Sequence, residues 1–224
     1  GYETTSSMAN RTDSDSYQVV GAINGDFYAS GGVTIGAQVS RGTLLKRPYP
    51  RSVFAMTAEK KPLIDIMSFN GQVTINDSTS IAINGVNETR QADYMVIYNH
   101  FMGSRTGTNQ WGAEVSIAYL DDPELVNSPF RAVVTAKDTI MEAGHGNMLI
   151  PPLNGAVLSG HGPARDFIKD AMEVGDTLTL QLNLTPGTEP IVELMGGTPR
   201  LIRNGAVSVE YIEEGVGSSF TNDR

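Results

Sequence analysis

Cysteine is absent from the 224 residues of this chain. Disulfides, thiolate nucleophiles, zinc–thiolate sites and iron–sulfur clusters are therefore excluded. No apolar run approaches the ~20 residues of a membrane-spanning helix, so no transmembrane segment is expected. Basic residues are outnumbered by acidic ones, 16 against 25, and the formal net charge is −9. This balance disfavours nucleic acid as a partner, because nucleic-acid binding depends on cations that neutralise phosphates. It still permits one local basic pocket for a single phosphate.

Short apolar stretches separated by turn residues form the commonest pattern in the sequence, and they predict β-strands. The expected strands are Gln18–Asn24, Thr34–Ser40, Thr43–Lys46, Ser52–Thr57, Leu63–Asn70, Gln72–Ile75, Ser80–Ile83, Tyr94–Asn99, Ala113–Leu120, Phe130–Lys137, Gly155–Ser159, Asp176–Leu184, Ile191–Leu194 and Arg200–Arg203. Hairpin turns are expected at Arg41-Gly42, Asn70-Gly71, Asp77-Ser78 and Asn204-Gly205, among other places, where positive φ is available.

Helices are expected to be few. A short one is predicted after Thr4-Thr5, and the clearest is Pro163–Met172, which begins with a proline suited to the first helical turn. The sequence thus predicts an α+β fold with mostly antiparallel or mixed sheets, built as a single β-rich domain over residues 1–224. The polar stretch Asn87–Asp93 is the candidate boundary if the domain is subdivided.

The stretch Asn24-Gly25-Asp26-Phe27-Tyr28 places a carboxylate between the end of an apolar run and two aromatic rings. A strand end can hold a functional side chain in position while leaving it open to solvent. An Asx-type turn followed by two core aromatics explains the same residues, and the local sequence does not choose between these interpretations.

A second candidate is the pair Gly196-Gly197, which follows an apolar strand and precedes Arg200. Consecutive glycines let backbone N–H groups approach a ligand closely and hold an anion, and Arg200 can then grip a phosphate. The alternative is a β-bulge or tight turn with a solvated Arg200.

Two further residues have chemistry to offer. His161 lies in a Gly-His-Gly context between a predicted strand and a predicted helix, where it can serve as a general acid or as an ordinary loop residue. Trp111 is the chain's one tryptophan and follows a polar loop, so it can stack on a sugar or fold back against the core. The spacing of the three histidines matches no metal-ligand pattern. Metal binding is left unassigned, although a divalent cation is compatible with the acidic balance and the oxygen-rich loops.

Taken in order, several motifs resemble the phosphodiester glycosidase family, whose known member removes N-acetylglucosamine from a phosphodiester. The motifs that carry the resemblance are Ser6-Ser7-Met8-Ala9, Ala22-Ile23-Asn24-Gly25-Asp26-Phe27-Tyr28, Ile35-Gly36-Ala37-Gln38-Val39-Ser40-Arg41-Gly42, Ile150-Pro151, Val157-Leu158-Ser159-Gly160-His161-Gly162, Gly175-Asp176 and Gly196-Gly197-Thr198-Pro199-Arg200-Leu201-Ile202-Arg203-Asn204-Gly205. The resemblance spans nearly the whole chain and implies that Asn24-Gly25-Asp26 lies at the active cleft.

The resemblance implies hydrolysis of a sugar-1-phosphodiester in exported or cell-surface glycans, with a carbohydrate or sugar-phosphate ligand. Asp26 is then the catalytic carboxylate and His161 a phosphate contact or acid. The expected substrate-binding residues are Asn24, Gly25, Tyr28, Trp111, Gly196, Gly197 and Arg200. The alternative is a non-catalytic carbohydrate-binding module of the cell envelope that stacks sugars on Trp111, Tyr28 and Tyr98.

The chain departs from the family pattern at both ends. It starts at the Met8-Ala9 motif without a signal peptide, and it ends at Arg224, before the family's later motifs. The interpretation is that neighbouring family segments belong to the same or a separate chain. The strands Gln18–Asn24 and Ile191–Leu194 are then expected to lack sheet neighbours.

Overall fold

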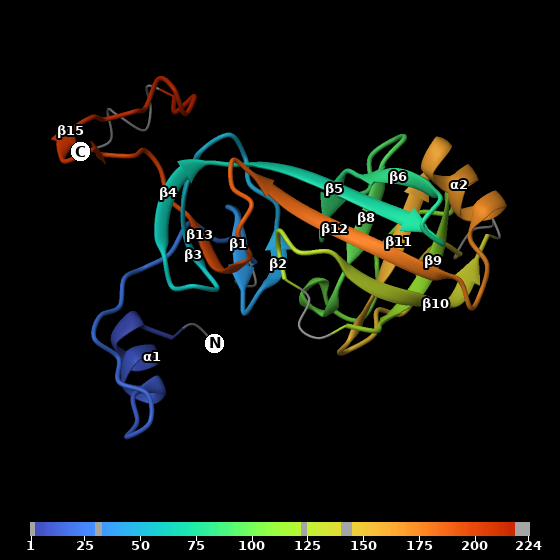
Figure 1. Cartoon of the computed structure of the whole chain (residues 1–224), viewed down its shortest axis with the longest axis horizontal. Helices are drawn as coiled ribbons and strands as arrows, with labels where there is room; N and C mark the ends of the chain where they lie inside the picture. Colours follow the sequence, from blue (N-terminus) through green and yellow to red (C-terminus); the bar gives the residue numbers. More distant parts are fainter. Residues whose placement is uncertain (1–2, 30–32, 122–124, 140–144, 218–224) are drawn as a thin grey trace.

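Two antiparallel-rich sheets make up most of the protein (Figure 1). The computed structural model describes residues 3–29, 33–121, 125–139 and 145–217. It confirms the β-rich fold class with few helices. In Figure 1 the smaller sheet lies beside one end of the larger one.

The smaller sheet has five strands in the order β2-β1-β13-β3-β4, and all neighbours are antiparallel. Its strands are β1 (Gln38–Ser40), β2 (Thr43–Lys46), β3 (Ser52–Thr57), β4 (Pro62–Ile66) and β13 (Ile191–Gly196). β13 comes late in the sequence but pairs with β1 and β3, so it lies between two strands from the early part of the chain.

The larger sheet has eight strands in the order β6-β5-β12-β10-β9-β11-β8-β7, antiparallel except for the β7–β8 pair. Its strands are β5 (Ser68–Ile75), β6 (Thr79–Ile83), β7 (Gly85–Val86), β8 (Met95–Tyr98), β9 (Gly112–Tyr119), β10 (Phe130–Asp138), β11 (Gly155–His161) and β12 (Thr177–Thr185). The helix α2 (Pro163–Ala171) packs against β11 and β9 and buries Ala164 and Ile168.

The remaining elements are peripheral. They are the helix α1 (Thr5–Thr12), the 3-10 turn η2 (His100–Met102) and the two-stranded hairpin of β14 (Ile202–Arg203) and β15 (Ala206–Val207). The side chain of Thr4 caps α1 by accepting a hydrogen bond from the Ser7 N–H, as the sequence predicted. Figure 1 shows α1 and the hairpin extending away from the smaller sheet on separate arms.

Alternating burial explains why these segments form strands. Along β12 every second residue is buried, which is the period of a strand with one face on the core. Both sheets contribute to one buried cluster, in which Val39 and Leu44 of the smaller sheet join Ile97 and Phe130 of the larger one. The sheets therefore share a core.

Most predicted strands are present, but Gln18–Asn24 is wrong. These residues form no strand, and Val20 and Ile23 are exposed by 100% and 84%. The other strand expected to lack neighbours, Ile191–Leu194, is flanked by β1 and β3. An apolar run alone therefore did not distinguish an unpaired arm from a central strand.

The predicted turn at Asn70-Gly71 is also wrong, because both residues lie inside β5 opposite Asn183 and Leu182. A Cβ on Gly71 would come within 2.6 Å of the Phe69 ring and 2.8 Å of the Ile83 carbonyl oxygen. Glycine here permits close packing against β6 rather than a change of direction. The turns at Arg41-Gly42 and Asn204-Gly205 are confirmed by positive φ at all four residues.

A pair of asparagines fastens the sheets together. The buried Asn99 donates from Nδ2 to the Leu44 carbonyl oxygen on β2, at 3.0 Å. Asn87 donates from its own Nδ2 to Leu45 O at 3.0 Å and to Asn99 Oδ1 at 2.7 Å. These amides therefore satisfy carbonyls of an edge strand that would otherwise be buried without partners.

We expect Asn99→Ala to lower the free energy of unfolding by about 2–3 kcal/mol, because it leaves buried donors and acceptors unpaired. Asn70→Ala, at an exposed position on β5, is the matched control and should change it by less than about 0.5 kcal/mol. Urea denaturation of both variants measures the difference. Equal losses would show that the asparagine pair does not fasten the sheets.

Candidate functional site

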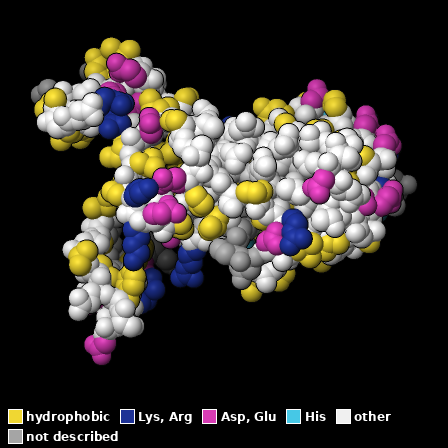
Figure 2. Space-filling model, viewed as in Figure 1, with side chains coloured by type: hydrophobic (Ala, Val, Ile, Leu, Met, Phe, Trp, Pro, Cys, Tyr) yellow, Lys and Arg dark blue, Asp and Glu magenta, His cyan; other side chains and the backbone are white. Residues whose placement is uncertain are grey.

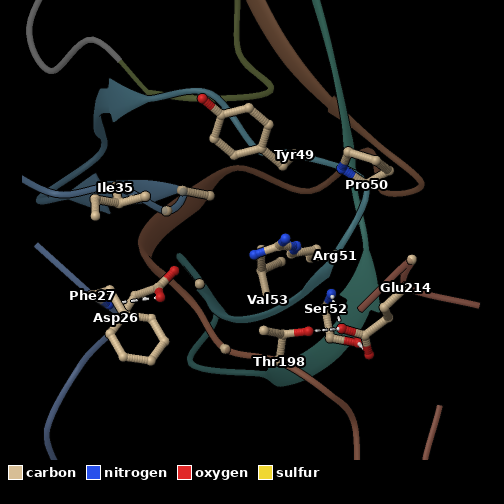
Figure 3. Close-up of a pocket in the computed structure, with 15 residues that line it drawn as sticks. Asp26, Phe27, Ile35, Tyr49, Pro50, Arg51, Ser52, Val53, Thr198 and Glu214 are labelled. Atoms are coloured by element: carbon tan, nitrogen blue, oxygen red, sulfur yellow. Dashed lines mark hydrogen bonds between the residues drawn. The ribbon is translucent and has the colours of Figure 1, made fainter. Parts of the chain in front are cut away.

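A pocket of about 380 Å³ lies where β1 and β3 of the smaller sheet begin and β13 ends, and five separate segments meet there (Figure 3). Its lining residues are Asp26, Phe27, Ile35, Gly36, Ala37, Tyr49, Pro50, Arg51, Ser52, Val53, Gly196, Gly197, Thr198, Glu214 and Gly215. They precede β1, enter and begin β3, follow β13 and belong to the C-terminal arm. The pocket thus brings together Asp26 and the Gly196-Gly197 pair, which are far apart in the sequence.

Asp26 sits directly against two glycines. Its Oδ1 accepts a hydrogen bond from the Phe27 N–H at 2.7 Å. A Cβ on Gly36 or on Gly196 would lie 1.5 Å or 2.2 Å from Asp26 Oδ2. Both positions therefore need glycine so that the carboxylate can reach this depth.

The expected amide nest at Gly196-Gly197 is not available to a ligand. The Gly196 N–H donates to the Ala37 carbonyl oxygen at 2.9 Å, and the Gly197 N–H donates to the Ser52 carbonyl oxygen at 3.0 Å. Both donors are used within the sheet region, so the two glycines serve close packing of Asp26 rather than anion binding.

Glu214 forms the floor of the pocket. The residue is only 2% exposed, and its carboxylate accepts hydrogen bonds from Ser52 N at 3.1 Å and Ser52 Oγ at 2.6 Å. It also accepts from Arg200 N at 2.7 Å and from the Thr198 hydroxyl. Burial raises the pKa of Glu214, but the hydrogen bonds from Ser52, Thr198 and Arg200 outweigh that effect and lower the pKa below 4.5.

Arg51 supplies the positive charge of the pocket. Its side chain makes no ion pair with any acidic residue in the described ranges. In Figure 3 its guanidinium and the Asp26 carboxylate face the same open space. Phe27 and Tyr49, exposed by 65% and 46%, lie on opposite sides of that space. The pocket therefore combines a carboxylate, a cation without an ion-pair partner among the described residues, and two aromatic rings.

Four predicted site residues lie near the pocket without lining it. Asn24 accepts a hydrogen bond from the Thr5 hydroxyl, Gly25 packs against Met195, and Tyr28 forms a β-bridge with Thr34. The guanidinium of Arg200 donates to the carbonyl oxygens of Ile202 and Ile64, at 3.0 Å and 2.8 Å, so only its backbone N–H contributes, through Glu214.

His161 and Trp111 belong to the larger sheet and do not line the pocket. His161 ends β11, where its Nδ1 accepts from the Asp93 N–H at 3.1 Å. Trp111 precedes β9 with its ring half exposed. Tyr98 is buried and its hydroxyl donates to Glu88 O, so it is not a free stacking ring. Local sequence does not say which sheet a loop belongs to, and the resemblance did not resolve it.

The sequence interpretation missed Tyr49, Arg51, Ser52 and Glu214. A signal was present for Arg51, because it is charged and stands at the start of the predicted strand Ser52–Thr57, as Asp26 stands near a predicted strand end. Glu214 carried none, since its partners are distant in sequence. Within the described ranges, no group of three or more His, Asp or Glu side chains is placed to hold a metal ion. No helix of the described chain is long and apolar enough to cross a membrane.

Comparisons with known proteins define the fold more than the function. No family model matches the sequence. A crystal structure of a hypothetical protein from Synechocystis superposes with a TM-score of 0.61 over 90% of this chain and 36% of its own, at 22% identity. A structure described as "Putative exported protein" from Burkholderia pseudomallei superposes with a TM-score of 0.55 over 88% of this chain and 44% of its own, at 18% identity. These likenesses concern the fold.

A curated relative matches only locally. It is described as "Putative threonylcarbamoyl-AMP synthase" of Mycobacterium tuberculosis, in strains CDC 1551 and H37Rv, and is 36% identical over 69 residues. The match covers 29% of this chain, which spans about a third of the length of that relative. So short a match does not carry the relative's activity over to this chain.

Gly196→Ala tests the seating of Asp26. We expect the added methyl group to displace the Asp26 carboxylate and to lower the free energy of unfolding by about 1–3 kcal/mol through overpacking. Gly197→Ala is the matched control, because a Cβ there meets nothing within 4 Å. Crystal structures and denaturation of the two variants measure this. An unmoved Asp26 in Gly196→Ala would contradict the proposed need for glycine.

Glu214→Gln tests the role of the Glu214 carboxylate through the pH dependence of stability. A lowered folded-state pKa means that the ionised carboxylate stabilises the fold fully above pH about 4.5, and that this stabilisation is lost as pH falls through the folded-state value. At pH 7 we expect the variant to be less stable by about 2–3 kcal/mol, since charged hydrogen bonds are removed. The difference should shrink below pH about 4.5. A difference that is constant with pH would contradict this account.

Proposed function

We propose that the protein hydrolyses a sugar-1-phosphodiester at the anomeric C–O bond. The observation that carries the proposal is the pocket in which Asp26 and Arg51, which forms no ion pair with a described residue, face one space between the rings of Phe27 and Tyr49. The resemblance to phosphodiester glycosidases points to the same reaction.

Asp26 is the carboxylate of this reaction. The water oxygen bonds to the anomeric carbon while the bond from that carbon to the phosphate oxygen breaks, and the electron pair leaves with the phosphate. Free sugar and a phosphate monoester result. Asp26 accepts the proton of the water and stabilises the positive charge that develops at the anomeric carbon.

Arg51 binds the phosphate. A guanidinium presents paired donors that match two phosphate oxygens, and its charge stabilises the monoester as it departs. A phosphate is a far better leaving group than an alkoxide, so this stabilisation replaces the strong general acid of an ordinary glycosidase. His161 is not needed for this step, which agrees with its place on the larger sheet.

Phe27 and Tyr49 orient the sugar. Exposed ring faces pack against the CH groups of a pyranose, and the partly apolar walls at Ile35 and Val53 exclude water around it. The proposal includes an exported or cell-surface location, in line with the description of the Burkholderia pseudomallei neighbour as an exported protein.

A carbohydrate-binding module is the second candidate. It is favoured by the small number of accessible carboxylates. Glu214 is held by four hydrogen bonds, so Asp26 is the one pocket carboxylate left open to a ligand in the described chain. A module would bind the same sugar phosphate without breaking it.

Turnover of a panel of sugar 1-phosphate methyl esters tests the proposal, with release of reducing sugar as the readout. We expect Asp26→Asn to reduce kcat by about 10²–10⁴-fold, because it removes the proton acceptor. Arg51→Gln should reduce kcat/KM by about 10²–10³-fold, as expected for loss of one oriented donor to the transition state. Arg41→Gln, in the β1–β2 turn, is the matched control and should retain activity.

Saturable binding of these esters without sugar release would favour the module over the enzyme. Wild-type turnover in Asp26→Asn would remove Asp26 from the mechanism. Equal effects of Arg51→Gln and Arg41→Gln would show that Arg51 has no specific role.

A further inference from the structure

The catalytic pocket has a neighbour of about 580 Å³ on the other side of Tyr49, which lines both. The neighbouring pocket, called here the second pocket, is lined by Val33, Lys46, Arg47, Tyr49, Asn87, Glu88, Thr89, Gln91, Tyr94 and Met102. The two pockets therefore adjoin each other at Tyr49.

The walls of the second pocket come from both sheets. Lys46 ends β2 of the smaller sheet, whereas Glu88 and Tyr94 lie between β7 and β8 of the larger one. Arg47 Nε and Glu88 Oε1 form an ion pair across the junction at 2.8 Å, and Asn87 binds the Leu45 carbonyl oxygen beside it. These contacts join the two sheets at the second pocket.

The lining of the two pockets is more balanced in charge than the chain as a whole. The chain carries −9, whereas the cations Lys46, Arg47 and Arg51 line these pockets together with the carboxylates of Asp26, Glu88 and Glu214. Glu88 neutralises Arg47, whereas Lys46 makes no ion pair within the part of the chain that the structure describes. Figure 2 shows Lys and Arg side chains over and below the smaller sheet, with Asp and Glu side chains beside some of them. Each pocket thus has one cation, Arg51 or Lys46, that forms no ion pair with a described residue.

We propose that the second pocket binds the next repeat of a glycan whose sugars are joined by phosphodiesters, with Lys46 holding the second phosphate. This rests on the proposed function of the first pocket. A pocket of 380 Å³ is enough for one small ligand, and 580 Å³ more accommodates another sugar with its phosphate. Tyr49 and Tyr94 supply ring faces for that sugar, as Phe27 and Tyr49 do in the first pocket.

The substrate class is therefore an anionic polymer that repeats sugar and phosphate, rather than a single sugar phosphate. Arg51 and Lys46 form no ion pair with a described residue and line pockets that adjoin at Tyr49, which matches an alternation of phosphate, sugar and phosphate. Nucleic acid also alternates these groups, but the net charge of −9 opposes its long uniform charge.

Comparison of a one-repeat and a two-repeat ligand tests the inference. The probes are a sugar 1-phosphate methyl ester and its two-repeat homologue with two phosphodiesters, titrated by calorimetry into Asp26→Asn so that neither is consumed. We expect the two-repeat ligand to bind at least about tenfold more tightly. Lys46→Gln in the same background should bring the ratio of the two dissociation constants close to one, whereas Lys169→Gln on α2 should preserve it.

The outcomes separate the inference from the proposed function. Equal affinities for one and two repeats overturn the second pocket as a subsite, even where the wild type cleaves both ligands. A Lys46-dependent two-repeat advantage without cleavage by the wild type supports the subsite and contradicts the hydrolase. No binding of either ligand overturns both. Oligothymidylate that binds more tightly than the two-repeat glycan, with the same dependence on Lys46, overturns the assignment to a glycan.

Discussion

The site depends on the hydrogen bonds that the buried carboxylate of Glu214 accepts. This carboxylate gathers the start of β3, the loop after β13 and the C-terminal arm by accepting hydrogen bonds from Ser52, Thr198 and Arg200. A buried carboxylate is costly unless its oxygens are hydrogen-bonded, and here four donors satisfy them. Once these hydrogen bonds form, the strand entry that carries Arg51 is fixed relative to the glycines against which Asp26 rests.

Two asparagines and two glycines also determine how distant segments pack together. Asn87 and Asn99 bind the carbonyl oxygens of β2 and so fasten the smaller sheet to the larger one beside the second pocket. Gly36 and Gly196 leave the space that Asp26 occupies. The two pockets are thus shaped by contacts between segments that lie far apart in the sequence.

This distinction explains what could be predicted. The bounds of β2 and β3 followed from the sequence, because alternation and the Arg41-Gly42 turn are local signals. The resemblance between ordered motifs assigned Asp26 and Gly196 to one site, and both line the first pocket. The fate of the Gly196 and Gly197 N–H groups could not be predicted, since it depends on the carbonyls of Ala37 and Ser52. Likewise His161 and Trp111 look as functional as Asp26 locally, and only the strand order assigns them to the other sheet.

We propose that hydrolysis in the first pocket breaks the bond between the anomeric carbon and the phosphate oxygen. Hydrolysis in ¹⁸O-labelled water shows directly which bond is broken. Mass spectrometry of the products of a sugar 1-phosphate methyl ester shows where the label resides. The account predicts ¹⁸O in the released sugar and none in the phosphate monoester. Label in the phosphate would mean attack at phosphorus, and would contradict the roles assigned to Asp26 and Arg51.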